Sequence, residues 1–148
     1  MAVRMELARI LIRELQDCQI IELREVGPPT EDGEPGGQLE GGRAFPILIG
    51  LPEAQAIERR LRGVQLKRPQ THDLLANVIR ELGATLVSIT IGDLKDHTFF
   101  ATLDVRLSTG DVKPIDCRPS DAIALGIASG VPIFVAEHVL EAASREEP

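Results

Sequence analysis

Hydrophobic and polar positions alternate in short runs along much of the chain, which is the pattern of β-strands that bury one face. Residues 98–107 show it most clearly, because Phe99, Ala101, Leu103 and Val105 fall on one face and Thr102 and Asp104 on the other. The runs are rich in Ile, Leu and Val. This pattern predicts strands over residues 5–14, 19–26, 44–49, 85–91, 98–107, 112–117 and 131–135.

Four other segments carry apolar residues at intervals of three and four, the spacing of one helix face. The third of them is apolar on nearly all sides, so we expect it to be buried against the sheet and against a further surface. Helices are predicted over residues 53–62, 71–82, 120–129 and 137–143. The second helix is predicted to bury a face made of Leu74, Leu75, Val78, Ile79 and Leu82.

The order of these elements predicts one domain of the α+β class over residues 1–148. Residues 85–117 contain three consecutive strands with tight turns, whereas elsewhere helices stand between strands. We therefore expect a mixed β-sheet that includes an antiparallel meander and is flanked by about four helices. The acidic, Gly- and Pro-rich residues 27–42 predict a long exposed loop, and residues 144–148 a frayed tail.

The composition suits one core, since 43% of the 148 residues are hydrophobic. Four Phe and no Tyr or Trp largely exclude base stacking on aromatic side chains as a binding mode. Cys18 and Cys117 lie far apart without a partner motif, which favours two reduced thiols. No apolar run approaches the roughly 18 residues of a membrane helix, and the N-terminus lacks a signal-peptide pattern. We expect a cytoplasmic protein with no membrane association.

Charge is unevenly distributed along the chain. The net charge of −7 argues against a general affinity for nucleic acid, because phosphates must meet positive charge locally. Residues 59–68 nevertheless carry cations and no anion, namely Arg59, Arg60, Arg62, Lys67 and Arg68. This segment is interpreted either as a nucleic-acid-binding patch or as the solvated face of a helix and the loop after it.

Two segments share one plan: Arg68 to Asp73 (RPQTHD) and Arg118 to Asp121 (RPSD). Each has Arg-Pro, a hydroxyl residue and an acid before an apolar helix. Proline extends the preceding Arg, the hydroxyl is expected to cap the helix, and the acid lies at its positive end. Such helix starts can receive an anion such as phosphate, although plain helix capping with an Arg–Asp ion pair is the alternative. We expect the two starts to border one cleft.

His72 is the titratable residue best suited to move a proton, because it lies in the first turn of a helix beside Asp73. Acids at strand ends or helix starts could hold Mg²⁺ or Mn²⁺ through oxygen ligands, namely Glu53, Asp73, Asp116 and Asp121. Their spacing matches no metal motif. The chain also lacks GxGxxG, GxxxxGK[ST], GxSxG and Cys–His zinc patterns, so the common nucleotide-binding and hydrolase chemistries are unsupported.

Four motifs, in order, are similar to the bifunctional nuclease domain family over roughly residues 4–142. They are FPILIGLPEAQAI from Phe45, RPQTHDLL from Arg68, DLKDHTFFATL from Asp93 and IDCRPSDAIALGIASGVPIFV from Ile115. The resemblance implies a mixed α+β fold, self-association, and nuclease activity on DNA and RNA reported for some members. Cys117 and Gly126 stand where the family commonly has Ala.

The leading hypothesis is a metal-assisted phosphodiesterase, a nuclease acting on DNA or RNA. Asp121 and Asp73, with Glu53 or Asp116, would hold the ion and His72 would move a proton. Arg118 and Arg68 would neutralise the phosphate.

Two alternatives stay open. A non-catalytic module could bind an anionic ligand or a partner through the same helix starts, or the chain could be an interaction protein. We also expect a homodimer or a higher symmetric homo-oligomer, because the apolar segment 120–129 has more surface than one small sheet readily covers.

Overall fold

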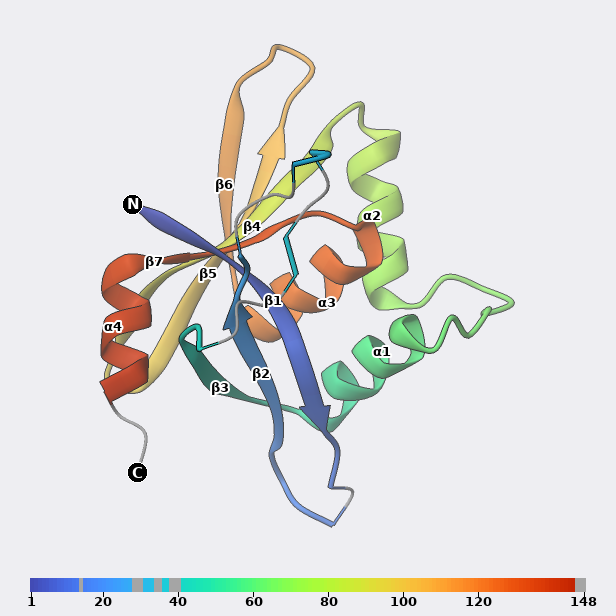
Figure 1. The fold of residues 1–148 in the computed structure, drawn as a ribbon. Coiled ribbons are helices and arrows are strands. Elements are labelled where there is room, and N and C mark those ends of the chain that lie inside the picture. The colour runs from blue at the N-terminus through green and yellow to red at the C-terminus, as the bar shows by residue number, and fades with distance from the viewer. Residues whose placement is uncertain (14, 28–30, 34–35, 38–40, 146–148) are drawn as a thin grey trace.

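The computed structural model describes residues 1–13, 15–27, 31–33, 36–37 and 41–145. Strands and helices follow the predicted order (Figure 1). The strands are β1 (Ala2–Leu11), β2 (Gln19–Glu25), β3 (Ala44–Ile49), β4 (Thr85–Lys95), β5 (Thr98–Arg106), β6 (Val112–Cys117) and β7 (Ile133–Ala136). The helices are α1 (Leu51–Leu61), α2 (Thr71–Glu81), α3 (Pro119–Ser129) and α4 (Glu137–Arg145).

Within the described residues, the strands form one seven-stranded sheet in the order β3-β2-β1-β7-β4-β5-β6. Neighbouring strands are antiparallel except β4 and β7, which are parallel and place Ile89 opposite Ile133. Strands β4, β5 and β6 form the expected meander. The α+β class and the mixed sheet are therefore confirmed.

The sheet curls around its core. The rings of Phe45 on β3 and Phe99 on β5 lie 5.5 Å apart between centroids, although several strands separate β3 from β5 in the sheet. Helix α4 contacts β3, β4 and β7, so it lies inside this curve. Twist accumulated over many strands produces such curvature. The buried positions of β1 to β5 and of β7 consequently share one core with α1, α3 and α4, whereas β6 has no fully buried residue.

Helix α3 lies in a sandwich between the sheet and two other helices. It contacts β4 and β5 on one side and α1 and α2 on the other (Figure 1). A Cβ at Gly126 would approach Ile89 Cγ1 to 3.3 Å, so the absence of a side chain there allows close packing of α3 on β4. The second surface expected for this apolar helix is thus supplied by the chain itself. The apolar surface of α3 is covered within the chain, so the prediction that it needs a second subunit is wrong.

Helix α2 contradicts the predicted packing most clearly. It contains no fully buried residue, and only Ala76 and Ile79 are partly buried against the core. Helix α2 packs against α3, and the rest of its apolar face is exposed to solvent. The exposed fractions are 56% for Leu74, 37% for Leu75, 43% for Val78 and 79% for Leu82.

Strand β4 departs from simple alternation, and some predicted segment ends differ from those in the structure. A β-bulge between Leu86 and Ser88 turns Leu86 into the core and leaves Val87 only partly buried. Strand β1 covers Ala2–Leu11, whereas the predicted strand covered residues 5–14, of which residue 14 lies outside the described residues. Helix α4 continues to Arg145, so the first two residues of the predicted tail over 144–148 belong to the helix. The rest of that tail lies outside the described residues. No described helix has the length and apolar character needed to cross a membrane.

Most of the loop predicted over 27–42 also lies outside the described residues. After it, the chain is fixed by Arg43, whose guanidinium donates to Glu25 on β2 and to Glu137 on α4. The hydrogen bond from Arg43 lowers the pKa of Glu25 below its ordinary value, although burial opposes the shift. This cluster holds two strands and a helix together and needs no further role.

Candidate functional site

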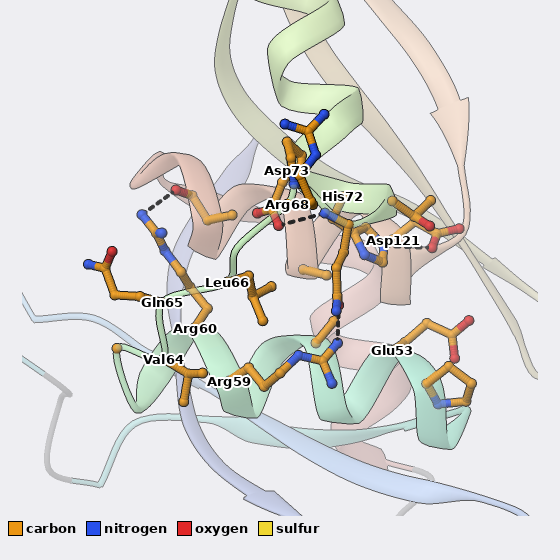
Figure 2. Close-up of a pocket in the computed structure, with 18 of the residues that line it drawn as sticks. Glu53, Arg59, Arg60, Val64, Gln65, Leu66, Arg68, His72, Asp73 and Asp121 are labelled. Atoms are coloured by element: carbon orange, nitrogen blue, oxygen red, sulfur yellow. Dashed lines mark hydrogen bonds and ion pairs between the residues drawn. The ribbon is translucent and has the colours of Figure 1, made fainter.

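A cavity of about 860 Å³ lies where α1, the 62–70 connection and the starts of α2 and α3 meet. Near its beginning this connection contains Gly63, which has a φ of 68°. The connection bows away from the helices between α1 and α2 (Figure 1). Figure 2 shows His72, Asp121 and Glu53 toward one end of the cavity and Arg60, Val64 and Gln65 toward the other. The volume lies within the usual range for small-molecule sites.

The two helix starts border this one cavity, as the sequence predicts, because His72, Asp73, Arg118 and Asp121 all line it. The capping differs from the expectation. Thr71 is the first residue of α2, and the Gln70 N–H before it donates to Asp73 Oδ2 at 3.1 Å. Asp73 and Gln70 thus form a capping box at the start of α2, since the Gln70 side chain in turn accepts from the Asp73 backbone N–H.

Helix α3 begins in a similar way. Arg118 has an extended backbone (φ −74°, ψ 147°) before Pro119, as expected for a residue that precedes proline. Ser120 is buried inside the first turn and makes no capping hydrogen bond. The expectation that hydroxyls cap these helices is therefore wrong at both starts, and the exposed Arg118 side chain is left at the rim.

Four side chains from three helix starts form a continuous chain of polar contacts. His72 Nε2 lies 3.1 Å from Asp121 Oδ1. Arg118 donates from Nε to Asp121 Oδ2 at 2.9 Å and from Nη2 to Asp121 Oδ1 at 3.2 Å. The same Nη2 donates to Glu53 Oε1 on α1 at 3.1 Å. One arginine thus bridges two carboxylates, and one of these contacts the histidine.

The neighbours of Asp121 in this network favour its ionised form. Burial raises the pKa of Asp121, but hydrogen bonds from Arg118 and His72 outweigh it and hold the pKa below its ordinary value. Asp121 is therefore ionised at neutral pH and can only accept hydrogen bonds. It follows that His72 Nε2 carries the proton in this contact. Among the described contacts none involves His72 Nδ1, so this nitrogen is available for proton transfer.

The basic segment divides into two groups. Arg59 donates to Gln70 Oε1 at 2.7 Å, Arg60 donates to the Ala128 carbonyl at 2.9 Å, and these two line the cavity together with Arg68. Arg62 instead pairs with Glu58 at 2.6 Å, and neither it nor Lys67 lines the cavity. Three of the five predicted nucleic-acid-binding residues are thus brought to the site.

The acids named as metal ligands divide similarly. Glu53, Asp73 and Asp121 line the cavity. Asp116 is exposed on β6 opposite Thr102, on the face of the sheet turned away from the core. Among the described residues, no three His, Cys, Asp or Glu side chains come together as a ready-made metal site.

Sequence reasoning missed two features of the cavity. Gln70 orients Arg59, but a glutamine before a helix gives no distinctive signal. Val64 and Leu66 form an apolar part of the wall, and their exposed fractions of 49% and 40% follow from the open 62–70 connection. Burial, and after it the charge of Asp121, raises the pKa of the Cys117 thiol to about 11, which disfavours the thiolate form at neutral pH.

Comparisons with known proteins identify the fold family. The model of the bifunctional nuclease domain matches residues 37–148, which includes all four helices and the whole cavity. Two relatives from Mycobacterium tuberculosis are the uncharacterized protein Rv1829 of strain ATCC 25618 / H37Rv and the uncharacterized protein MT1877 of strain CDC 1551 / Oshkosh. Each is 42% identical over 103 residues, which is 70% of this chain. The match covers 60% of the length of each relative.

Proposed function

The chain belongs to the bifunctional nuclease domain family, and from this membership we propose that its cavity binds single-stranded DNA or RNA and hydrolyses a phosphodiester. One observation carries the proposal: the His72–Asp121 contact stands beside Arg118 in a cavity that also holds Arg59, Arg60 and Arg68. Four arginines against three carboxylates give the described wall a positive balance on a protein of net charge −7. This local excess is what a phosphate backbone requires.

Arg118 is the residue proposed to meet the reacting phosphate. Its side chain is 66% exposed, and Nε and Nη2 make its described contacts with Asp121 and Glu53. Nη1 therefore remains for an anionic oxygen. The two carboxylates fix the guanidinium before substrate arrives, so little reorganisation is needed when charge develops in the transition state.

His72 is proposed as the general acid–base. Its side chain is only 18% exposed, and Asp121 holds the ring through Nε2. Nδ1 can then accept a proton from an attacking water and return it to the leaving oxygen. Only an imidazole whose Nδ1 carries no proton can act as this base.

Mg²⁺ or Mn²⁺ remains a proposal as an assisting ion. Mg²⁺ is commonly held by one or two carboxylates together with substrate phosphates and waters. Asp73, Asp121 and Glu53 on the cavity wall would supply such carboxylates. Asp116, which lies on β6 opposite Thr102, is not one of the residues that line the cavity. When bound, the ion would supply further neutralisation of phosphate charge.

The test compares wild type with an Arg118→Met/Asp121→Asn double variant purified in the same way. We expect wild type to cleave single-stranded DNA and RNA, and the variant to be slower by about 10³-fold or more, because it loses a preorganised cation and the partner of His72. EDTA should abolish the wild-type activity if an ion assists. Equal cleavage by the two preparations would identify a contaminating nuclease and refute the proposal.

The same two preparations also test the alternative that the chain is a non-catalytic module that binds an anionic ligand. A non-catalytic module would bind an oligonucleotide or inorganic phosphate in wild type and lose that affinity in the double variant, with no cleavage in either.

We also propose that the chain forms a homodimer through α2. The exposed stripe of Leu74, Leu75, Val78 and Leu82 runs along one helix face and begins next to His72 and Asp73. Apolar surface of this kind is stabilised by exclusion from water. A two-fold axis across α2 would pair the stripe with itself, as isologous dimers do.

Val78→Glu tests this dimer. A charge placed in the paired stripe should raise the dissociation constant by about 100-fold, because the carboxylate would lose its hydration without gaining a partner. Light scattering at micromolar concentration should report a dimer for wild type and a monomer for the variant. Leu48→Glu is the matched control, since Leu48 is 64% exposed on β3, away from α2. A wild-type monomer at that concentration would contradict the proposal.

A further inference from the structure

Gly50 precedes α1 at its N-cap position, and its backbone does not explain why it is a glycine. Its φ of −77° and ψ of 161° are extended values that any residue adopts. A Cβ built there would instead lie 2.5 Å from Glu53 Oε2, well inside van der Waals contact, and at ordinary distances of 3.5 Å from Glu53 Cδ and 3.7 Å from Pro52 Cδ. The only close obstacle is therefore the Glu53 carboxylate.

The Glu53 carboxylate occupies the space beside Gly50. Glu53 is at the third helical position, where a carboxylate can turn back toward the N-cap and the positive end of the helix dipole. Its side chain is only 15% exposed in this conformation. From here Oε1 accepts the hydrogen bond from Arg118 Nη2 at 3.1 Å.

The position of Arg118 depends on both of its carboxylates. Asp121 lies three residues further along α3, so this pair alone leaves a long, 66% exposed side chain tied to its own helix. Glu53 adds a contact from another element, α1, and thereby fixes the guanidinium across the cavity rim.

We propose that Gly50 is a positioning residue: the space left by its missing side chain lets Glu53 fold over the start of α1 and hold Arg118 beside Asp121 and His72. Gly50 itself contacts no substrate. The effect on turnover rests on the proposed nuclease function, whereas the effect on Arg118 does not.

The experiment uses Gly50→Ala and Gly50→Ser in the full chain. Alanine is a poorer N-cap than glycine and serine a better one, so the two variants differ in helix capping but share the Cβ. We expect both to move the NMR signal of the Arg118 Nε–Hε group in the same direction as Glu53→Ala, because Glu53 Oε2 must move away from the added Cβ. We also expect both to slow turnover by about tenfold, the value of one charge-assisted hydrogen bond at a reacting centre.

A double-mutant cycle completes the test. If Gly50 acts only through Glu53, Gly50→Ala should have no further effect on the Arg118 signal or on turnover in a Glu53→Ala background. An unchanged Arg118 signal in both Gly50 variants, beside a shifted one in Glu53→Ala, would overturn the inference. Recovery of the wild-type signal in Gly50→Ser would overturn it too, because capping would then be the cause. A wild type without nuclease activity that shows the predicted NMR pattern would refute the proposed function and support the role of Gly50.

Discussion

Replacing His72 by alanine should reduce turnover by about 10²–10⁴-fold, the usual contribution of a positioned general acid or base. The affinity for a single-stranded oligonucleotide should stay near the wild-type value, because the arginines that meet the phosphates are unchanged. The ring contacts Asp121 and is mostly buried, but Asp121 keeps its two hydrogen bonds from Arg118 when the ring is removed. Single-turnover cleavage and fluorescence anisotropy, measured on the same preparations, separate the two effects.

His138→Ala is the matched control for this change. His138 lies on α4, its side chain is 67% exposed, and its Nε2 is 3.6 Å from Asp93 Oδ1, away from the cavity lining. Its removal should leave turnover unchanged. If His72→Ala and His138→Ala turn over equally, proton transfer by His72 is excluded, and the anion-binding alternative becomes the better account of the cavity.

The site could be predicted from sequence where local chemistry dictates geometry. The Arg-Pro units extend Arg118 and start α3 at Pro119, and Asp121 in the first turn then lies within reach of the same arginine. Such short-range relations follow from the peptide backbone alone. Helices α2 and α3 are separated in sequence by the antiparallel meander of β4, β5 and β6. The meander brings the start of α3 back to the end of the sheet at which α2 begins, so the two helices lie side by side.

Other features depend on long-range packing and had no local signal. The apolar face of α2 is as regular as that of a buried helix, yet only Ala76 and Ile79 reach the core, because α3 already covers the sheet beneath it. The bulge at Leu86 reverses the inside and outside of the first part of β4, which simple alternation cannot anticipate. The periodicity of a sequence therefore identifies the apolar face of a helix or strand, but it does not show whether another part of the protein covers that face.

The basic segment shows the same limit at the level of single side chains. Arg59 and Arg62 are three residues apart on one helix end, and periodicity alone places them together. In the structure, Gln70 orients Arg59 toward the cavity, whereas Glu58 binds Arg62 one turn away. The partner of each arginine, and not its place in the sequence, therefore decides which charges face a substrate.

Neutralising Arg59, Arg60 and Arg68 together as glutamines should weaken binding of a single-stranded oligonucleotide and flatten its salt dependence. Each lost phosphate contact reduces the log–log slope by about 0.7, so three contacts reduce it by about 2. Between 50 and 200 mM salt, wild type should then lose about 20-fold more affinity than the variant. The rate at saturating substrate should change little, because these side chains hold the strand away from the reacting phosphate at Arg118.

The control is a triple variant with the same loss of charge, made by changing Arg62, Lys67 and Lys113 to glutamine. None of these three lines the cavity, and Lys113 lies on the distant β6 strand. If binding follows the total charge of the protein, both triple variants should weaken it equally. If it follows the cavity, only the first should lose affinity and slope. Wild-type binding by the cavity variant would show that these arginines form a solvated helix face and would move the nucleic-acid path elsewhere on the surface.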